Sequence, residues 1–265
     1  MVDLGSLCDD LDAEQRALDE LVGPLEAGAW ATATPAEGWD VADCISHLCY
    51  FDETARLAVT DPDTFAAHAE ALMADFDRNE DDVAIGRGAT AAELLARWRD
   101  GRAALLTTLR GLDPSTRIPW YGPAMSAASF ATARMMETWA HGQDVVDALD
   151  AEPVVSDRLR HVCHIGVGAR AYSYLVNGVD DPGDPIFVEV DAPSGGTWTW
   201  GAADSPNAVR GSALDLALVV THRRNIADTG LVAQGAVAEQ WIGIAQSFAG
   251  PAGPSRPTGM RHLRQ

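Results

Sequence analysis

The stretch AASFATARMMETWAHGQDVVDAL, residues 127–149, decides the fold of the first half of the chain. Its large apolar residues recur at helical spacing, which predicts one long helix that buries one face. Within this helix, Glu137 and His141 are four residues apart. That spacing places both side chains on one face, one turn from each other. The same stretch therefore predicts a helix and a pair of side chains able to hold a common ligand.

The segments on either side of this stretch predict three further long helices. Apolar residues recur at helical spacing over residues 4–22, 41–59 and 91–111. Asp40 is the expected N-cap of the second helix, with Asp43 three residues on as an imperfect capping box. A shorter helix is expected after Pro62, and residues 77–88 and 113–126 have the composition of loops. Four long helices with such connections predict an antiparallel bundle.

The second half of the chain changes character and predicts a small α+β domain. Residues 186–193 and 196–201 have strand composition around a Ser-Gly-Gly turn, which indicates a hairpin. A strand is also expected at 231–235, and helices at 154–177, 209–224 and 236–248. We therefore predict a bundle domain over 1–152, an α+β domain over 153–250 and a flexible tail over 251–265.

Composition limits the classes of partner. The net charge is −20, from 39 acidic and 19 basic residues, which disfavours binding to nucleic acid or to an anionic membrane surface. The first residues do not have the pattern of a signal peptide, and the sequence has no apolar run of membrane-spanning length. A cytoplasmic location is therefore expected. The four cysteines are irregularly spaced, and buried free thiols are expected rather than disulfides.

Metal binding is the chemistry that the spacing favours. If the helix over 41–59 faces the helix over 127–149, His47 can converge with Glu137 and His141. Two imidazoles and one carboxylate form a catalytic type of zinc site, with a fourth position left open. On spacing alone, the Glu-x-x-x-His pair is a weak signal, because such pairs also form surface ion pairs, and a lone histidine on an apolar face is more often packed in the core. The remaining candidates His68, His222 and His262 have no partner at ligand spacing.

Two segments of the bundle carry a family resemblance. GWDVADCISHL (38–48) and PWYGPAMSAASFATARMMETWAHGQDVVDAL (119–149) resemble an actinobacterial metal-binding family related to mycothiol-dependent maleylpyruvate isomerase. That family belongs to the DinB-like bundle superfamily. VRGSALDLALVVTHRRN (209–225) and GLVAQGAVAEQWIGIAQSFAG (230–250) resemble the sterol-carrier-like domain that follows the bundle in the isomerase. The resemblance implies a mainly α fold, with a DinB-like four-helix bundle followed by a small α+β sterol-carrier-like domain.

The resemblance also implies a site and a chemistry. It gives His47, Glu137 and His141 as ligands of a divalent metal, most simply zinc, with mycothiol as a thiol cofactor. The expected activity is a metal-dependent isomerase or thiol S-transferase that acts on a small electrophilic metabolite. Two alternatives stay open: a thiol-free Lewis-acid enzyme of a biosynthetic pathway, and a non-catalytic module that binds metal or a small molecule. The expected partner is a small molecule, and a homodimer remains open.

Four neighbouring residues are tentative members of the site. Asp144 can orient a ligand imidazole, or it can be a solvent-facing charge. Arg134 can hold an anionic group of the substrate, or it can form an ion pair on its own helix. Trp120 and Tyr121 precede the helix that carries two ligands, and they can line the site or simply pack within their loop.

Overall fold

The computed structural model describes residues 3–74, 81–253 and 256–259. The chain divides into two compact units, Met1–Ala151 and Glu152–Gln265. The flexible tail predicted over 251–265 falls partly outside the described residues, and so does His262. Within the described part, no helix is both long enough and apolar enough to cross a membrane.

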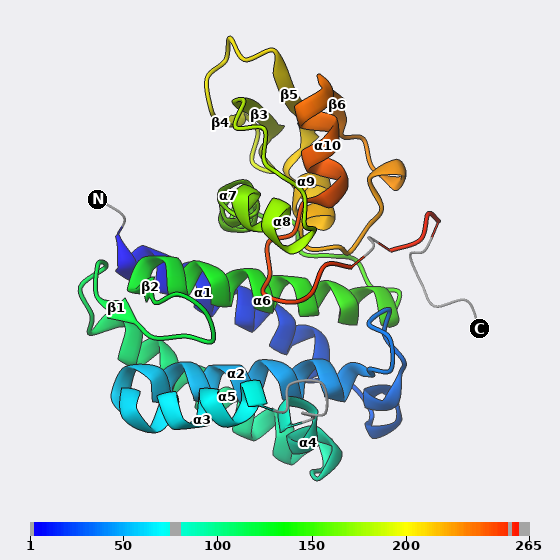
Figure 1. Ribbon diagram of the computed structural model, residues 1–265. Coiled ribbons are helices and arrows are strands. Elements are labelled where there is room, and N and C mark those ends of the chain that lie inside the picture. The colour runs from blue at the N-terminus through cyan, green and yellow to red at the C-terminus, as the bar shows by residue number, and fades with distance from the viewer. Residues whose placement is uncertain (1–2, 75–80, 254–255, 260–265) are drawn as a thin grey trace. The chain divides into compact units, whose positions relative to one another are not determined.

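The first unit is a bundle of long helices, as predicted. α1 (Leu4–Val22), α2 (Val41–Thr60), α5 (Ala91–Arg110) and α6 (Ala127–Ala148) lie side by side (Figure 1). Shorter elements join them: the 3-10 turn η1 (Ala27–Ala31), α3 (Pro62–Ala74) and α4 (Asp81–Arg87). The loop predicted over 113–126 contains two short antiparallel strands, β1 (Arg117–Ile118) and β2 (Met125–Ser126).

Local capping fixes where the helices of the site begin. The backbone N–H of Asp43 donates to the Asp40 carboxylate at 2.9 Å, and the N–H of Asp40 donates back to Asp43 at 3.4 Å. The predicted capping box of α2 is thus complete. The Ser126 hydroxyl accepts from the N–H of Ser129 at 3.1 Å and starts α6. Each cap satisfies backbone donors that the first helical turn leaves unpaired, so the two starting points are fixed by adjacent sequence.

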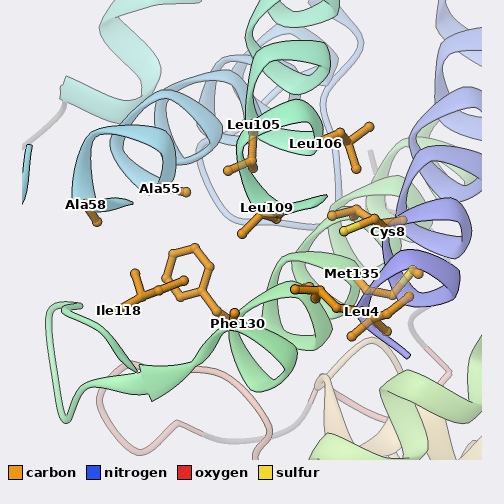
Figure 2. Packing of buried hydrophobic residues seen from close by; sticks show 14 of the residues in the cluster. Leu4, Cys8, Ala55, Ala58, Leu105, Leu106, Leu109, Ile118, Phe130 and Met135 are labelled. Carbon is orange, nitrogen blue, oxygen red and sulfur yellow. The ribbon is translucent and has the colours of Figure 1, made fainter. Parts of the chain in front are cut away.

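The core of the bundle is formed by apolar side chains from all four long helices. Figure 2 shows one cluster, in which Leu105 and Leu109 of α5 lie beside Phe130 of α6. Ile118 of β1 joins them, so the loop before α6 is anchored in the core. Burial of one such side chain contributes about 1.5–3 kcal/mol, and this packing holds α6 against its neighbours.

One helix of the bundle was not predicted. Residues 77–88 were expected to form a loop, but the described part of that range contains α4. Gly86 explains why α4 can form there: a Cβ at this position would lie 3.0 Å from the Cβ of Ser46 on α2. The N–H of Gly86 donates to the Ser46 hydroxyl at 2.9 Å, and that hydroxyl donates to the carbonyl of Asp82 at 2.7 Å. Contact with α2 therefore stabilises a short helix whose own sequence has no apolar period.

The second unit is a small α+β unit, as predicted. The strands are β3 (Ile186–Asp191), β4 (Thr197–Trp200), β5 (Asn207–Ser212) and β6 (Val232–Gln234), and the helices are α7 (Leu159–Gly168), α8 (Arg170–Val176), α9 (Ala213–Val220) and α10 (Ala236–Ile244). The sheet has the order β4-β3-β5-β6. Strand β3 is antiparallel to β4 and parallel to β5, and β5 is antiparallel to β6. The predicted hairpin is formed by β3 and β4.

Two helix predictions in this unit were wrong in extent. The helix expected over 209–224 is strand β5 followed by α9, with the change at Ser212. Strand β5 lies between two neighbours and buries consecutive residues, and a buried strand of this kind cannot be distinguished from a helix by its period. The helix expected over 154–177 is divided into α7 and α8 at Ala169. All four cysteines are buried free thiols, as expected.

Candidate metal centre

Three side chains predicted to converge do so between α2 and α6. His47 lies in the second turn of α2, and Glu137 and His141 lie one turn apart on α6. The Nε2 atom of His141 is 3.6 Å from Oε2 of Glu137, and Nε2 of His47 is 3.9 Å from the same oxygen. One donor atom from each residue lies within 4.8 Å of the other two. The helix packing thus presents two nitrogens and one oxygen to a common point.

The other ring nitrogen of each histidine contacts a carboxylate. Nδ1 of His47 is 2.9 Å from Oδ2 of Asp82, and Nδ1 of His141 is 3.4 Å from Oδ2 of Asp144. A carboxylate at Nδ1 favours the tautomer with its proton on Nδ1, which leaves the Nε2 lone pair able to bind a cation. Asp144 is fully buried, so it is not the solvent-facing charge of the alternative interpretation. Asp82 was missed, because it lies in the segment taken for a loop.

The charges of the site favour a cation. Burial alone would lower the pKa of His47, but the neighbouring Asp82 and Glu137 carboxylates outweigh that effect and raise it. Burial likewise opposes ionisation of Glu137, yet the neighbouring His141 and His47 hold the pKa of Glu137 well below its ordinary value. The ionised Glu137 beside two imidazoles creates a negative field at the point where the three side chains meet.

Aromatic rings enclose the two histidines. Trp39 stacks on His141, with ring centroids 5.4 Å apart and an interplanar angle of 23°. Trp39 also lies 5.1 Å from the ring of His47, and Phe51 lies 4.6 Å from that ring. The side chains of His47, Glu137 and His141 nevertheless remain 15%, 24% and 11% exposed. The site is therefore largely shielded from water but not closed to it.

The donor set fits a zinc ion. Zinc binds imidazole nitrogen and carboxylate oxygen at about 2.0–2.2 Å, so tetrahedral ligands lie roughly 3.3–3.5 Å from one another. The distances from Glu137 to the two histidines exceed this by only a few tenths of an ångström. Cys44 forms a second group with His141 and Asp144, but all three are buried, whereas the His47 group is partly exposed. This partial exposure favours His47, Glu137 and His141 as the metal-binding group.

Arg134 has a different role from the one predicted. Its guanidinium lies 3.0 Å from the carboxylate of Asp52 on α2, and the two side chains are 3% and 0% exposed. Gln15 of α1 donates a further hydrogen bond to Asp52 at 3.3 Å. The buried guanidinium of Arg134 is therefore engaged in an ion pair that joins two helices instead of lying along its own. Spacing along α6 could not reveal this, because the partner comes from another helix.

Trp120 and Tyr121 pack against Phe51, the residue whose ring contacts His47. Both rings lie close to Phe51, with centroids 6.2 Å and 5.8 Å away, and Phe51 in turn contacts His47. Trp120 also stacks on Phe65 of α3. The loop before α6 thus extends the aromatic wall that begins at Trp39.

Known proteins are similar to this chain in sequence. Residues 11–146 match the family model of the mycothiol maleylpyruvate isomerase N-terminal domain. Uncharacterized proteins from two strains of Mycobacterium tuberculosis are 45% identical over 257 residues, which is 97% of this chain and all of each relative.

Solved structures agree in fold. The crystal structure of the mycothiol-dependent maleylpyruvate isomerase matches with a TM-score of 0.55, and that of an alanine mutant of it with 0.56. Each match covers 88% of this chain and 93% of the other at 14% identity, so it shows a common fold. Sequence and structure lead to one assignment: the chain belongs to the family of the mycothiol maleylpyruvate isomerase N-terminal domain.

Proposed function

We propose that the chain is a metal-dependent enzyme that uses a thiol cofactor, which in its family is mycothiol. The enzyme either isomerises a small electrophile or transfers the thiol to it. The observation that carries this proposal is the convergence of His47, Glu137 and His141 on one point, within a negative field and behind an aromatic wall. The match to the isomerase family supplies the thiol and the class of substrate. We propose the same three side chains as the metal ligands.

Each residue of the site has a separate task in this proposal. A zinc ion there would supply an open coordination position and lower the pKa of a thiol that binds to it. Glu137 offsets part of the metal charge, and Asp82 and Asp144 hold the imidazoles in the ligating tautomer. Trp39 and Phe51 exclude water from the two rings, which strengthens every charge interaction between them.

The thiol requirement is the test of this function. Metal-loaded protein should convert maleylpyruvate only when mycothiol is present, because the thiol is the nucleophile. Rates are to be compared with and without mycothiol, with protein treated by a chelator as the control. Equal rates in thiol-free buffer would instead support a Lewis-acid enzyme. Tight binding without turnover of any of a panel of electrophiles would support a binding module.

A further prediction concerns Asp82, the residue that the sequence did not identify. Asp82→Asn should weaken zinc binding by about 10–100-fold, because the amide holds the His47 imidazole less firmly in the ligating tautomer. Competition with a chromophoric chelator at fixed pH measures this affinity. Asp81→Asn is the matched control, since Asp81 is exposed on the same turn of α4. An equal loss in both variants would show that the effect is one of overall charge.

A further inference from the structure

Helix α4 contacts α2 along the face that carries the proposed metal ligand His47. Ser46 and His47 lie three and four residues after Asp43, which places the three side chains at neighbouring positions around α2. The guanidinium of Arg87 on α4 lies 3.2 Å from the Asp43 carboxylate, and the Asp82 carboxylate lies 2.9 Å from Nδ1 of His47. Ser46, between these two contacts, bonds to the backbone of α4. Three adjoining contacts thus hold α4 against the first turns of α2.

The hydroxyl of Ser46 makes the contact that specifies the position of α4 most narrowly. It donates to the carbonyl of Asp82 at 2.7 Å and accepts from the N–H of Gly86 at 2.9 Å. These two backbone groups are four residues apart, the spacing that an α-helix joins by its own hydrogen bond. One fully buried hydroxyl therefore contacts both ends of a single turn of α4. A rotation or shift of α4 would break at least one of the two bonds.

The position of α4 depends on this contact because the helix is too short to be stable alone. It spans only Asp81–Arg87, and isolated helices shorter than about 12–15 residues are marginal in water. The backbones of α4 and α2 approach closely at Gly86, where a Cβ would lie 3.0 Å from the Cβ of Ser46 and 3.1 Å from the carbonyl oxygen of Ala42. Contact with α2 therefore determines where α4 lies.

Asp82 links the position of α4 to the metal centre. Its carbonyl accepts from Ser46, and its carboxylate contacts the ring of His47. Only the short side chain of Asp82 separates the atom that Ser46 holds from the atom that contacts the imidazole. Ser46 and His47 are adjacent in the chain, but adjacent side chains on a helix do not face each other. The path from Ser46 to the imidazole therefore passes through α4.

We propose that Ser46 is a positioning residue of the metal centre: it holds α4 where Asp82 reaches His47, so that zinc binding is coupled to the docking of α4 on α2. The inference rests on the proposed function, because it needs the metal centre, and deepens it by naming the helix that sets the affinity of that centre. Coupling between two binding events is reciprocal. A change that loosens α4 should therefore weaken zinc binding, and zinc should hold α4 more firmly.

A double-mutant cycle tests whether Ser46 acts through Asp82. Ser46→Ala should weaken zinc binding by about 3–10-fold, which is less than the loss expected for Asp82→Asn. In protein that already carries Asp82→Asn, the same change should weaken zinc binding by less than about twofold. Competition with a chromophoric chelator measures all four affinities. Ser173→Ala in the second unit is the matched control and should leave zinc affinity unchanged, because its buried hydroxyl likewise donates to a carbonyl, that of Ala169, and accepts from an N–H, that of Gln246.

Gly86→Ala tests the same coupling without removing a polar group. Alanine has a higher helix propensity than glycine, so the change favours α4 as a helix. The added Cβ would nevertheless lie too close to Ser46 and Ala42, so α4 must move away from α2. Zinc binding should therefore weaken about as much as in Ser46→Ala. Gly101→Ala on α5 is the control, because a Cβ there would make only an ordinary contact, 3.6 Å from Glu53.

Hydrogen exchange of residues 81–87 gives a second readout. Zinc should slow exchange of these amides in the parent protein, and should slow it less in Ser46→Ala and Asp82→Asn. Unchanged zinc affinity in Ser46→Ala or Gly86→Ala would overturn the proposal. So would equal weakening by Ser46→Ala with and without Asp82→Asn, or exchange in α4 that zinc does not alter. Parent protein that binds no zinc would reject the metal centre and this inference together, whereas zinc binding without thiol-dependent turnover would reject only the proposed enzyme.

Discussion

Replacing His141 by alanine should reduce bound zinc from one ion per chain to a small fraction of that. Residues that only orient a ligand typically change metal affinity by about 10–100-fold, so the loss of one ligand in three should exceed about 100-fold. The Nε2 atom of His141 is 3.6 Å from Glu137, and α6 contains no second histidine to replace it. Two remaining ligands would leave zinc with half of its tetrahedral set.

Metal analysis after dialysis against a weak chelator measures the effect. His164→Ala is the matched control: His164 is exposed on α7, where its Nδ1 accepts from the indole of Trp200 at 3.2 Å. The control should keep its zinc, and thermal unfolding should show that both variants are folded. Full zinc occupancy in His141→Ala would contradict the assignment of the three ligands.

The second large effect is expected at the buried ion pair between α2 and α6. Arg134→Met should lower the free energy of unfolding by about 3–5 kcal/mol, because it leaves Asp52 buried without its countercharge. Burial already raises the pKa of Asp52 in spite of Arg134. Without the guanidinium, Asp52 must either stay ionised at a high cost or take up a proton. Urea unfolding near neutral pH gives the change directly.

The exposed ion pair between Arg97 and Glu53, the residue that follows Asp52, provides the comparison. Arg97 lies 2.7 Å from Glu53, with side chains that are 52% and 35% exposed. Arg97→Met should therefore change the free energy of unfolding by no more than about 1 kcal/mol. Combining Arg134→Met with Asp52→Leu should recover most of the lost stability, because apolar replacement of both partners removes the unpaired charge. Equal effects of the two arginine variants would show that burial of the pair is not what matters.

Prediction of the fold succeeded where local sequence is sufficient. The long helices, the capping box at Asp40 and the β3–β4 hairpin depend on residues close to one another in the chain. It failed at α4, which is stabilised by the approach of Gly86 to Ser46, and at β5, which is stabilised by strands on both sides. In both cases the decisive neighbours are distant in sequence. Period and composition carry no information about such contacts.

In the candidate site, too, local sequence predicted some residues and missed those whose partners lie on other elements. The i,i+4 spacing of Glu137 and His141 was enough to place both on one face of α6. The predicted bundle allowed His47 of another helix to converge with them, and the family resemblance implied the same three ligands. Asp144 could also be predicted from the sequence, because it lies three residues from His141 on the same helix. Nothing in the spacing pointed to Asp82 or Ser46, whose partners lie on other elements.

The sequence by itself determined which long helices form in the first unit, where two of them begin, and which side chains of α6 share a face. These properties follow from backbone hydrogen bonding and from a fixed rotation per residue, so neighbours along the chain are sufficient. Only the tertiary structure decided that Arg134 pairs with Asp52, that Asp82 orients His47, and that Ser46 bonds to the backbone of α4. Those contacts depend on how each helix is rotated and how closely it packs against the next. Packing of side chains from the whole core sets both quantities.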